Sequence, residues 1–399
     1  MRVLSVTESY APFLEFGGPP VKVRALAKGL AGRGHNVTVL TADWGVRKRR
    51  NLKEKFAPEA DALGWKWTEN GVTAIYLRTW LKYRSLTWNP GVKRFCRTQL
   101  ASCDIAHIFG LYDFLGPAVA AACVRRGIPY VLEPIGMYVP IVRSLRLKKL
   151  YHSIFGKRLF ERAATIVTTS EQEAEELAAG GITREKITLR RNGVETPGTW
   201  PERGLLRKRL GIGMGAKVIL FLGRLSEKKS PDLLLQAFAR TAKDLVSSHL
   251  KLIFAGPDEG GMQNQLRVLA EQLAVTPDVH FAGALFDEAK WAAYRDADVF
   301  VLPSQNENFG NTAAESVAAG TPVIVTENCG IAPLLENAAG LVVPHEESAL
   351  ANALRSLTCD AALHAKLAAG CAEATSRMGW EEPVRHTEEL YHSLVVHGR

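Results

Sequence analysis

The chain has 399 residues, of which 47% are hydrophobic and 23% are charged, and its formal net charge is +9 at pH 7. This length predicts about two or three domains, and the composition is ordinary for a soluble globular protein. No apolar run approaches the roughly 18 to 20 residues of a membrane span, and the first residues lack the long apolar region of a signal peptide. We therefore expect a cytoplasmic protein.

The charge is unevenly distributed along the chain. Residues 1–199 contain 31 Lys and Arg against 17 Asp and Glu, a net charge of +14, whereas residues 200–399 contain 19 against 24, a net charge of −5. Such an asymmetry favours an anionic partner for the first half, although a well-solvated basic surface is the alternative. The six cysteines show no CxxC spacing, so we expect reduced thiols instead of disulfides or metal ligands.

The first half alternates predicted strands and helices, which indicates a parallel sheet with right-handed crossovers. Ser170 and Glu173 fit a capping box at the start of one helix. The predicted strands are Arg2–Thr7, 34–42, Val72–Arg78, Asp104–Ile108, Tyr130–Glu133 and Thr165–Thr168. The predicted helices are Pro20–Arg33, Pro90–Leu100, Phe114–Arg126, a basic helix over Ser144–Arg162, and one that follows Ser170.

The segment Arg190–Gly204 is rich in Gly and Pro, which indicates a linker, and the alternation then restarts. We expect an N-terminal domain at 1–195, a C-terminal domain at 196–377, and a last segment, 378–399, whose helix packs back on the first domain. The predicted strands of the second domain are Lys217–Gly223, Lys251–Gly256, Asp278–Gly283, Val299–Ser304, Pro322–Thr326 and Leu341–Pro344; the helices include Pro231–Arg240, Met262–Leu273 and Asp287–Tyr294.

Two loops of the second domain carry side chains suited to a nucleotide diphosphate. Arg224 and Lys229 follow a predicted strand in GRLSEKKSPD, where paired N–H donors and a point charge suit a diphosphate. The stretch ENFGNTAAE places Glu307 and Glu315 eight residues apart, around a turn that opens a helix. Because the two loops leave strands of one sheet, we expect them to face one crevice.

The helix that begins in ENFGNTAAE offers its free amides to a phosphate at Asn311 and Thr312. Glu315 lies one turn further and is placed to accept hydrogen bonds from a ribose diol. Paired carboxylates are also typical of glycosidases, but a glycosidase would leave the cationic loop without a task. In the first domain, Gly17 and Gly18 precede a helix and would let backbone amides approach an anion, although a structural turn is an equal alternative.

The chain resembles glycosyltransferase family 4, on Gly17-Gly18, RNGVE, GRLSEKK and the E-x7-E stretch, which occur in the family's order over nearly the full chain. The resemblance implies an α/β protein of the GT-B fold, with two Rossmann-like doubly wound domains facing a central cleft. It implies a retaining glycosyltransferase of the surface-polysaccharide type that moves a sugar from a nucleotide-diphosphate donor, without a cofactor or metal ion. From the basic first half of the chain we expect the acceptor to be a saccharide or a polyprenyl-diphosphate-linked one.

By the same resemblance, each motif takes a role in the site. Arg224 and Lys229 hold the diphosphate, Glu315 binds the ribose, and Glu307 contacts the donor sugar. The remaining donor-binding residues are Gly18, Gly223, Phe309, Gly310, Asn311 and Thr312. The leaving phosphate would take the proton of the acceptor, so that no protein base is needed.

The acceptor side matches the family less well. Relatives often carry D-x-x-H-x-H at a strand end, whereas this chain has Asp104 and His107 followed by Phe109. His107 is therefore a candidate catalytic residue, with a buried structural role as the alternative. Asp296 and Asp298 form a DxD, a metal-binding signature of another glycosyltransferase fold, but they lie at the amino end of a predicted strand and are interpreted as structural.

Three basic tracts carry the excess charge of the first half, and aromatic residues accompany the first two. These properties favour an anionic membrane surface, so we expect peripheral attachment to the inner membrane face; no nucleic-acid motif is present. The basic tracts are 47–55, 78–97 and 143–162, and the aromatic residues are Trp44, Trp65, Trp67, Trp80, Tyr83, Trp88 and Phe95. The rival functions are a nucleotide-sugar 2-epimerase or hydrolase on the same fold and a non-catalytic sugar- or nucleic-acid-binding protein.

Overall fold

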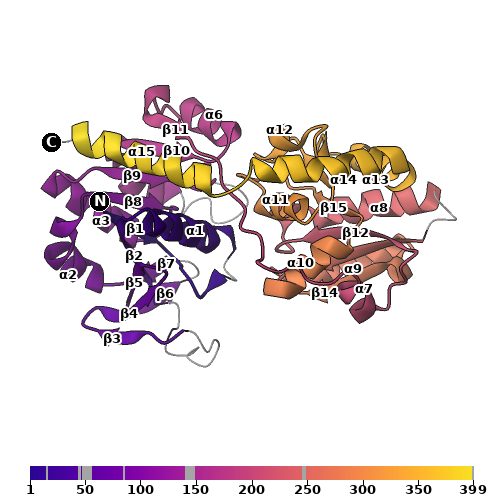
Figure 1. Cartoon of the computed structure of the whole chain (residues 1–399), viewed down its shortest axis with the longest axis horizontal. Coiled ribbons are helices and arrows are strands. Elements are labelled where there is room, and N and C mark those ends of the chain that lie inside the picture. The colour runs from indigo at the N-terminus through magenta and orange to yellow at the C-terminus, as the bar shows by residue number, and fades with distance from the viewer. Residues whose placement is uncertain are drawn as a thin grey trace. The chain divides into compact units, whose positions relative to one another are not determined.

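The chain forms two compact units in the computed structural model, which describes residues 1–14, 17–43, 46, 56–83, 86–139, 149–244 and 249–397. The N-terminal unit comprises Met1–Gly193 and Trp380–Arg399, and the C-terminal unit comprises Val194–Gly379. The chain passes between the units twice, so its last helix belongs to the unit in which the chain begins (Figure 1).

The N-terminal unit is built on a sheet whose described strands follow the order β11-β10-β9-β8-β1-β2-β5-β4-β3. Strands β11 to β5 in this order are parallel, whereas β4 and β3 add an antiparallel edge that the sequence did not predict. The strands are β1 (Arg2–Thr7), β2 (Asn36–Ala42), β3 (Glu59–Asp61), β4 (Gly64–Glu69), β5 (Val72–Leu77), β8 (Ile105–Phe109), β9 (Tyr130–Glu133), β10 (Thr165–Thr168) and β11 (Ile187–Leu189), and a separate hairpin pairs β6 (Leu81–Tyr83) with β7 (Leu86–Trp88).

Helices cover both faces of this sheet and bury an aliphatic and aromatic core against it. The expected basic helix Ser144–Arg162 lies partly outside the described residues, and its described part contains a π-helical turn, His152–Gly156, before α5. The helices are α1 (Gly18–Gly32), α2 (Gly91–Thr98), α3 (Leu115–Arg126), α5 (Lys157–Arg162), α6 (Glu171–Ala179) and α15 (Glu381–His397), with 3₁₀ turns at Leu100–Ser102 and Arg184–Lys186.

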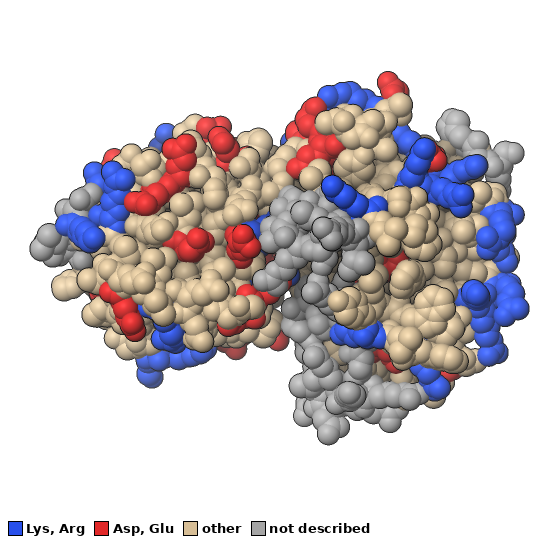
Figure 2. Space-filling view, turned by 180° about the vertical axis from the view of Figure 1, so that it is seen from behind, with Lys and Arg blue, Asp and Glu red and all other residues tan. Residues whose placement is uncertain are grey.

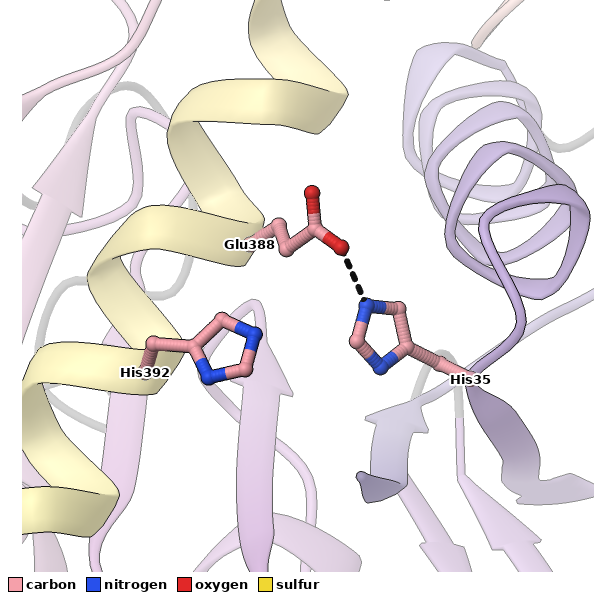
Figure 3. A group of neighbouring side chains, drawn as sticks. All are labelled: His35, Glu388 and His392. Carbon is pink, nitrogen blue, oxygen red and sulfur yellow. Dashed lines mark hydrogen bonds and ion pairs between the residues drawn. The ribbon is translucent and has the colours of Figure 1, made fainter.

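The last helix, α15, packs closely on α1. Val384 and Tyr391 of α15 are 3% and 1% exposed and join the core around β1 and β2. A Cβ atom added to Gly29 of α1 would lie 2.4 Å from a methyl group of Val384, so the contact requires a glycine. At the end of α1, His35 pairs with Glu388 of α15 (Figure 3). The helix is therefore an integral layer of the N-terminal unit.

The C-terminal unit contains a six-stranded parallel sheet in the order β14-β13-β12-β15-β16-β17. Apart from Lys217 at the start of β12, its central strands β12 and β15 are apolar, because helices cover both faces. The strands are β12 (Lys217–Leu222), β13 (Leu250–Ala255), β14 (Val279–Gly283), β15 (Val299–Leu302), β16 (Val323–Thr326) and β17 (Gly340–Val343).

The helices of the C-terminal unit connect these strands as right-handed crossovers of a doubly wound domain require. They are α7 (Leu205–Leu210), α8 (Pro231–Asp244), α9 (Met262–Gln272), α10 (Asp287–Asp296), α11 (Asn311–Ala318), α12 (Ala332–Leu335), α13 (Glu347–Cys359) and α14 (Ala361–Ser376), with 3₁₀ turns at Glu227–Lys229 and Thr276–Asp278. Both units thus have helices on both faces of a mainly parallel sheet, which is the doubly wound architecture that the sequence predicts.

The surface charge follows the asymmetry of the sequence. Lys and Arg side chains gather along the edge of the N-terminal unit at the right of Figure 2, whereas Asp and Glu are more frequent on the C-terminal unit at the left. The basic tract 47–55 lies outside the described residues, as does the first part of the tract 143–162. Among the described helices, none combines the length and the apolar character that a membrane crossing needs.

Candidate functional site

The strands β12 and β15 are neighbours in the sheet, although they are the first and fourth strands of their unit in sequence. The order reverses at this point, and α/β proteins bind ligands beyond the carboxyl ends of such strands. The backbone N–H of Gln305, after β15, donates to the carbonyl oxygen of Lys228, after β12, at 3.0 Å. The two loops therefore meet at this edge of the sheet, as the sequence predicts.

Lys229 and Glu307 form an ion pair that links the two loops. Both side chains are largely shielded from solvent, at 16% and 19% exposed. Burial lowers the pKa of the Lys229 ammonium, and Arg224 and Lys228 add repulsion, whereas the Glu307 carboxylate favours the charged form. An anionic ligand such as a diphosphate would also pair with these cations. Lys229 could then exchange Glu307 for the ligand as its counter-ion.

Arg224 lies on the same loop but reaches into solvent. Its side chain is 62% exposed, and its guanidinium lies 3.5 Å from the carboxylate of Glu259. This weak surface pairing leaves the side chain free to turn toward a ligand. The N–H of the preceding Gly223 already donates to the carbonyl of Ala255 at 2.9 Å, so this amide is used within the protein.

The loop that carries Glu307 is fixed by the segment that follows β16. The N–H of Glu307 donates to the carbonyl of Asn328 at 2.9 Å, and its own carbonyl accepts from Gly330 at 2.9 Å. Ile331 donates to the carbonyl of Phe309 at 2.7 Å, and the Phe309 ring is 2% exposed. Phe309 therefore anchors the loop in the core, and the position of Glu307 is determined by backbone hydrogen bonds.

The helix α11 begins immediately after this loop. Gly310 caps it with a φ of 106°, in the left-handed region that favours glycine, and a Cβ atom there would lie 2.9 Å from a methyl group of Ile331. Asn311 and Thr312 are the first helical residues, as the sequence predicts, and the first amides of a helix attract anions. The loop and the helix start thus combine a fixed backbone with a partial positive charge.

Glu315 is held by two side chains of α10 that sequence reasoning missed. Lys290 donates to one carboxylate oxygen at 2.7 Å, and the hydroxyl of Tyr294 donates to the other at 2.9 Å. Burial raises the pKa of Tyr294 well above its ordinary value, so its hydroxyl stays protonated and donates. The four-residue spacing of Lys290 and Tyr294 on a helix signals a shared face, but only the fold brings that face to Glu315.

Two buried polar atoms beside Glu307 lack a hydrogen-bond partner among the described residues. They are the hydroxyl oxygen of Ser304, three residues before Glu307, and the side-chain oxygen of Asn308, directly after it. Buried polar groups are rarely left unsatisfied, so these atoms suit hydrogen bonds to a ligand or to water. Their place in the sequence, at the end of a strand and inside ENFGN, is the signal that points to them.

Gly18 is the first residue of α1, so the helix begins two residues before the start at Pro20 that the sequence predicts. Pro19 and Pro20 occupy the first turn of this helix, where proline is tolerated. Glu15 and Phe16 lie outside the described residues, so the structure gives the helix start and not the whole loop.

His107, the candidate catalytic residue of the N-terminal unit, lies in β8 and is completely buried. Its Nδ1 atom is 2.6 Å from the hydroxyl of Tyr391 in α15, and its Nε2 atom is 3.4 Å from the carboxylate of Glu133. Burial lowers the pKa of His107, so the ring is neutral at neutral pH. The imidazole thus lies in a network inside the N-terminal unit.

Glu133 is the centre of this network. It accepts from Lys22 at 2.5 Å and from Arg190 at 2.7 Å, and all three side chains are at most 2% exposed. Burial alone would raise the pKa of Glu133, but the cations of Arg190 and Lys22 outweigh it and hold the pKa below its ordinary range. A carboxylate in this environment is ionised at neutral pH.

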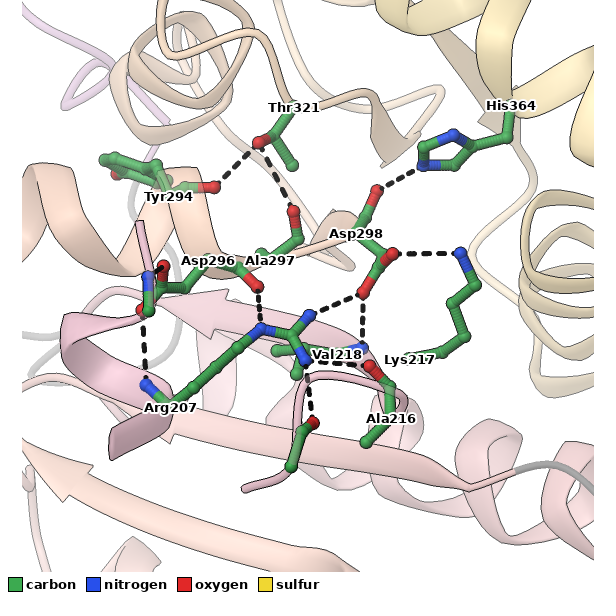
Figure 4. Close-up of polar contacts among 12 residues, drawn as sticks. Arg207, Ala216, Lys217, Val218, Tyr294, Asp296, Ala297, Asp298, Thr321 and His364 are labelled. Carbon is green, nitrogen blue, oxygen red and sulfur yellow. Dashed lines mark hydrogen bonds and ion pairs between the residues drawn. The ribbon is translucent and has the colours of Figure 1, made fainter. Parts of the chain in front are cut away.

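The Asp296–Asp298 motif is engaged in contacts within the C-terminal unit (Figure 4). The Asp296 carboxylate accepts from the amides of Leu206 and Arg207 at the start of α7, at 2.7 and 3.2 Å. Asp298 accepts from the Arg207 guanidinium at 2.9 Å and from Lys217 at 3.0 Å. These carboxylates connect the amino ends of α7, β12 and β15, at the opposite end of the strands from Glu307.

The C-terminal unit therefore places a cationic loop, a fixed carboxylate and a helix start at the switch point of a doubly wound sheet. Two family models match the chain, "Glycosyl transferase 4-like domain" over residues 17–193 and "Glycosyl transferases group 1" over residues 202–375. The chain belongs to glycosyltransferase family 4.

Curated relatives carry glycosyltransferase names. The chain is 32% identical over 251 residues to the D-inositol 3-phosphate glycosyltransferase of Corynebacterium urealyticum, an alignment that covers 60% of this chain but only 59% of that protein. It is 27% identical over 406 residues to the protein of the same name from Thermomonospora curvata, covering 94% of this chain and 90% of the relative.

Solved structures share the fold. The Anabaena protein HepE, in complex with UDP-glucose, superposes with a TM-score of 0.74 over 98% of this chain and 100% of that chain, at 19% sequence identity. At this level of identity the likeness shows the fold alone, and it confirms the GT-B architecture of two Rossmann-like domains.

Proposed function

We propose that the chain is a retaining glycosyltransferase, which moves a hexose from a nucleotide-diphosphate sugar to a saccharide or polyprenyl-diphosphate-linked acceptor in the synthesis of cell-surface polysaccharides. One observation carries the proposal: Lys229 and Glu307 meet where the loops after β12 and β15 join. A cation for the leaving phosphate and a carboxylate for the sugar are the two groups that donor activation needs, and they are adjacent.

A bound donor would replace the ion pairs that Lys229 and Arg224 form with Glu307 and Glu259. Arg224 and Lys229 bind the diphosphate, and the release of Glu307 from Lys229 leaves its carboxylate to accept hydrogen bonds from sugar hydroxyls. Glu315, already oriented by Lys290 and Tyr294, accepts from the ribose diol. The start of α11 adds its partial positive charge to the phosphate side.

The proposed chemistry uses the leaving group as the base. As the bond between the anomeric carbon and the diphosphate oxygen breaks, negative charge develops on that oxygen, where Arg224 and Lys229 stabilise it. The diphosphate oxygen takes the proton of the attacking acceptor hydroxyl on the same face, so the anomeric configuration is retained. We propose that these cations fill the role that a metal ion has in other transferases, and that no cofactor takes part.

The comparisons and the charge of the first half favour particular classes of donor and acceptor. UDP-glucose is bound by the related fold of HepE, which favours a UDP-sugar donor. The relatives named for inositol 3-phosphate and the net charge of +14 in residues 1–199 both favour an anionic acceptor. A phosphorylated polyol and a diphosphate-linked lipid share this property, and an assay with both distinguishes them.

We further propose that the N-terminal unit docks on an anionic membrane through the β6–β7 hairpin. Trp80, Leu81 and Tyr83 are 69%, 71% and 60% exposed there, and Trp88 is 44% exposed. Exposed aromatic residues beside Lys and Arg suit the interface of an anionic bilayer. The sequence interpretation is wrong for Trp65 and Phe95, which are 9% and 0% exposed and belong to the core.

A flotation assay with vesicles tests the docking proposal. At low salt, we expect recovery with vesicles that contain anionic phospholipid and little recovery with purely zwitterionic ones. Replacing Trp80 and Leu81 with Ser reduces the recovery if the hairpin is the docking element. Equal recovery with both vesicle types would exclude an anionic surface as the partner.

The proposed reaction is tested by incubation with UDP-, GDP- and ADP-sugars, with and without candidate acceptors. Acceptor-dependent release of the nucleotide, and a product whose anomeric proton coupling matches that of the donor, support retaining transfer. Turnover of the donor at the same rate without any acceptor would favour the epimerase or hydrolase. A Glu307→Gln variant with unchanged activity would favour a non-catalytic site or a different one.

A further inference from the structure

Two histidines and a glutamate of the N-terminal unit lie close together, and none of them belongs to the proposed donor site. His35 lies in the turn between α1 and β2, and Glu388 and His392 lie four residues apart on α15 (Figure 3). The four-residue spacing puts Glu388 and His392 on one face of the helix, and that face is turned to His35. Elements separated by 353 residues in sequence thus contribute to one cluster.

The cluster has the geometry of an incomplete coordination sphere. One ligand atom of each residue lies within 4.8 Å of the other two, and Nε2 of His35 is 2.7 Å from an oxygen of Glu388. The rings of His35 and His392 are 6.1 Å apart between centroids. Ligands at about 2.0 Å from a tetrahedral ion are about 3.3 Å from one another, so His392 has to move by only about 1 to 2 Å.

Of the three side chains, only that of His392 is exposed enough to make this movement. His392 is exposed, whereas the side chains of His35 and Glu388 are 7% and 17% exposed and are held in place. Arg33 donates to the far oxygen of Glu388 at 2.6 Å, which turns the other oxygen to His35. The Nδ1 atom of His35 lies 3.1 Å from the Met1 nitrogen, which directs Nε2 into the cluster. Outer contacts of this kind orient metal ligands.

We propose that His35, Glu388 and His392 bind one divalent transition-metal ion of the Zn²⁺ class. Two imidazole nitrogens and one carboxylate oxygen are ligands that Zn²⁺ commonly takes, with a water molecule in the fourth position. The ion replaces the hydrogen that now joins Nε2 of His35 to Glu388. The neutral ring then carries its hydrogen on Nδ1, and the Met1 ammonium that faces Nδ1 gives up one proton, so that one proton in all is released to solvent. The remaining ligand, His392, closes over the ion from the solvent side.

The ion connects α15 to the turn that follows α1. The same helix carries Tyr391, whose hydroxyl bonds His107, so its position affects the buried network of the N-terminal unit. The metal ion would therefore hold the last helix in place, and its ligands are not residues of the proposed donor site. Among the described residues, no other group of three histidine, cysteine or acidic side chains meets the same distance criterion.

The test is calorimetric titration of the full-length protein, without an affinity tag, with ZnCl₂. All proteins carry Cys359→Ser, because Cys359 is the exposed cysteine and would bind zinc by itself. The variants are His392→Ala, which removes an exposed ligand, and Glu388→Gln, which keeps the shape of the side chain but removes the charge. His386→Ala, on the same helix but outside the cluster, is the matched control.

We expect one Zn²⁺ per chain for the parent and for His386→Ala, with a rise in melting temperature on zinc addition. His392→Ala and Glu388→Gln should each weaken the binding roughly tenfold or more and abolish the rise. Substitution with Co²⁺ should give the intense visible absorption of a four-coordinate site. Absence of stoichiometric binding to the parent, or binding by His392→Ala and Glu388→Gln that is as tight as that of the parent, would overturn the proposal.

Discussion

The hydroxyl of Tyr391 lies 2.6 Å from Nδ1 of His107, and both side chains are buried. The contact joins the last helix of the chain to a central strand of the N-terminal sheet, 284 residues earlier in sequence. His107, which the sequence suggests as a catalytic residue, is thus hydrogen-bonded inside its unit. The consequence can be measured on stability and activity separately.

Tyr391→Phe should lower the stability of the N-terminal unit by about 1 to 2 kcal/mol, because it leaves a buried histidine nitrogen without its partner. Affinity for the nucleotide should not change. Urea denaturation followed by fluorescence measures the first quantity and calorimetry the second. Val396→Ala, at a side chain of the same helix that is 70% exposed, is the control and should change neither quantity. Unchanged stability of Tyr391→Phe would show that the contact contributes nothing.

Glu133→Gln should destabilise the N-terminal unit more strongly, by about 3 to 5 kcal/mol, since Lys22 and Arg190 would then be buried without a counter-charge. The melting temperature of the variant is the measurement. Glu161→Gln removes a carboxylate that is 54% exposed and serves as the control. A loss as small as that of the control would mean that water reaches the two cations.

Stability should depend on pH through Glu173. Burial raises the pKa of Glu173 to about 7, from 4.5 in the absence of burial, although the amides of Gly136 and Thr169 bond its carboxylate. Between pH 4.5 and about pH 7, the Glu173 carboxyl is protonated in the folded state and ionised in the unfolded state. The stabilisation is therefore complete below about pH 4.5 and is lost as the pH rises through about 7, by about 3 kcal/mol at most.

The comparison of Glu173→Gln with the parent isolates this contribution, because other buried acids, such as Asp113, act in the same direction. The unfolding free energy of the parent should fall more steeply between pH 5 and pH 8 than that of Glu173→Gln. Glu171→Gln, in the first turn of the same helix and exposed, should keep the parental slope. Parallel slopes for the parent and Glu173→Gln would refute the assignment.

Glu315→Gln should weaken binding of a UDP-sugar by roughly tenfold, since hydrogen bonds to a charged group contribute about 1.5 to 3 kcal/mol. If the carboxylate binds the ribose, the loss is smaller for 2′,3′-dideoxy-UDP, which lacks the diol. Calorimetric titration of both ligands with both proteins gives the four affinities. An equal loss for the two ligands would place Glu315 away from the ribose.

The architecture can be predicted from local patterns in the sequence. Alternating apolar runs and amphipathic helices predict two doubly wound units, and each loop motif follows a strand that the sequence also predicts. Lys229 and Glu307 are expected at neighbouring loops for this reason. Their ion pair confirms that the loops meet, while the roles of the two side chains toward a donor stay predictions.

Other features depend on pairings that no local pattern expresses. The antiparallel strands β3 and β4 arise in a charged, Trp-bearing insertion whose alternation is irregular, and Trp65 is buried only because β4 pairs with β5. Lys290 and Tyr294 reach Glu315 through the packing of α10 against α11. His35 meets Glu388 because α15 returns to the first unit, and a sequence separation of 353 residues hides this contact.

The most direct measurement of the central claim, that Lys229 holds a nucleotide diphosphate, is titration of UDP into the parent, Lys229→Met and Lys243→Met proteins. Lys243 lies exposed in the last turn of α8 and controls for the loss of one positive charge. Lys229→Met should bind UDP roughly 10 to 100 times more weakly than the parent, while Lys243→Met should bind as the parent does. Equal affinity of Lys229→Met and the parent would contradict the claim.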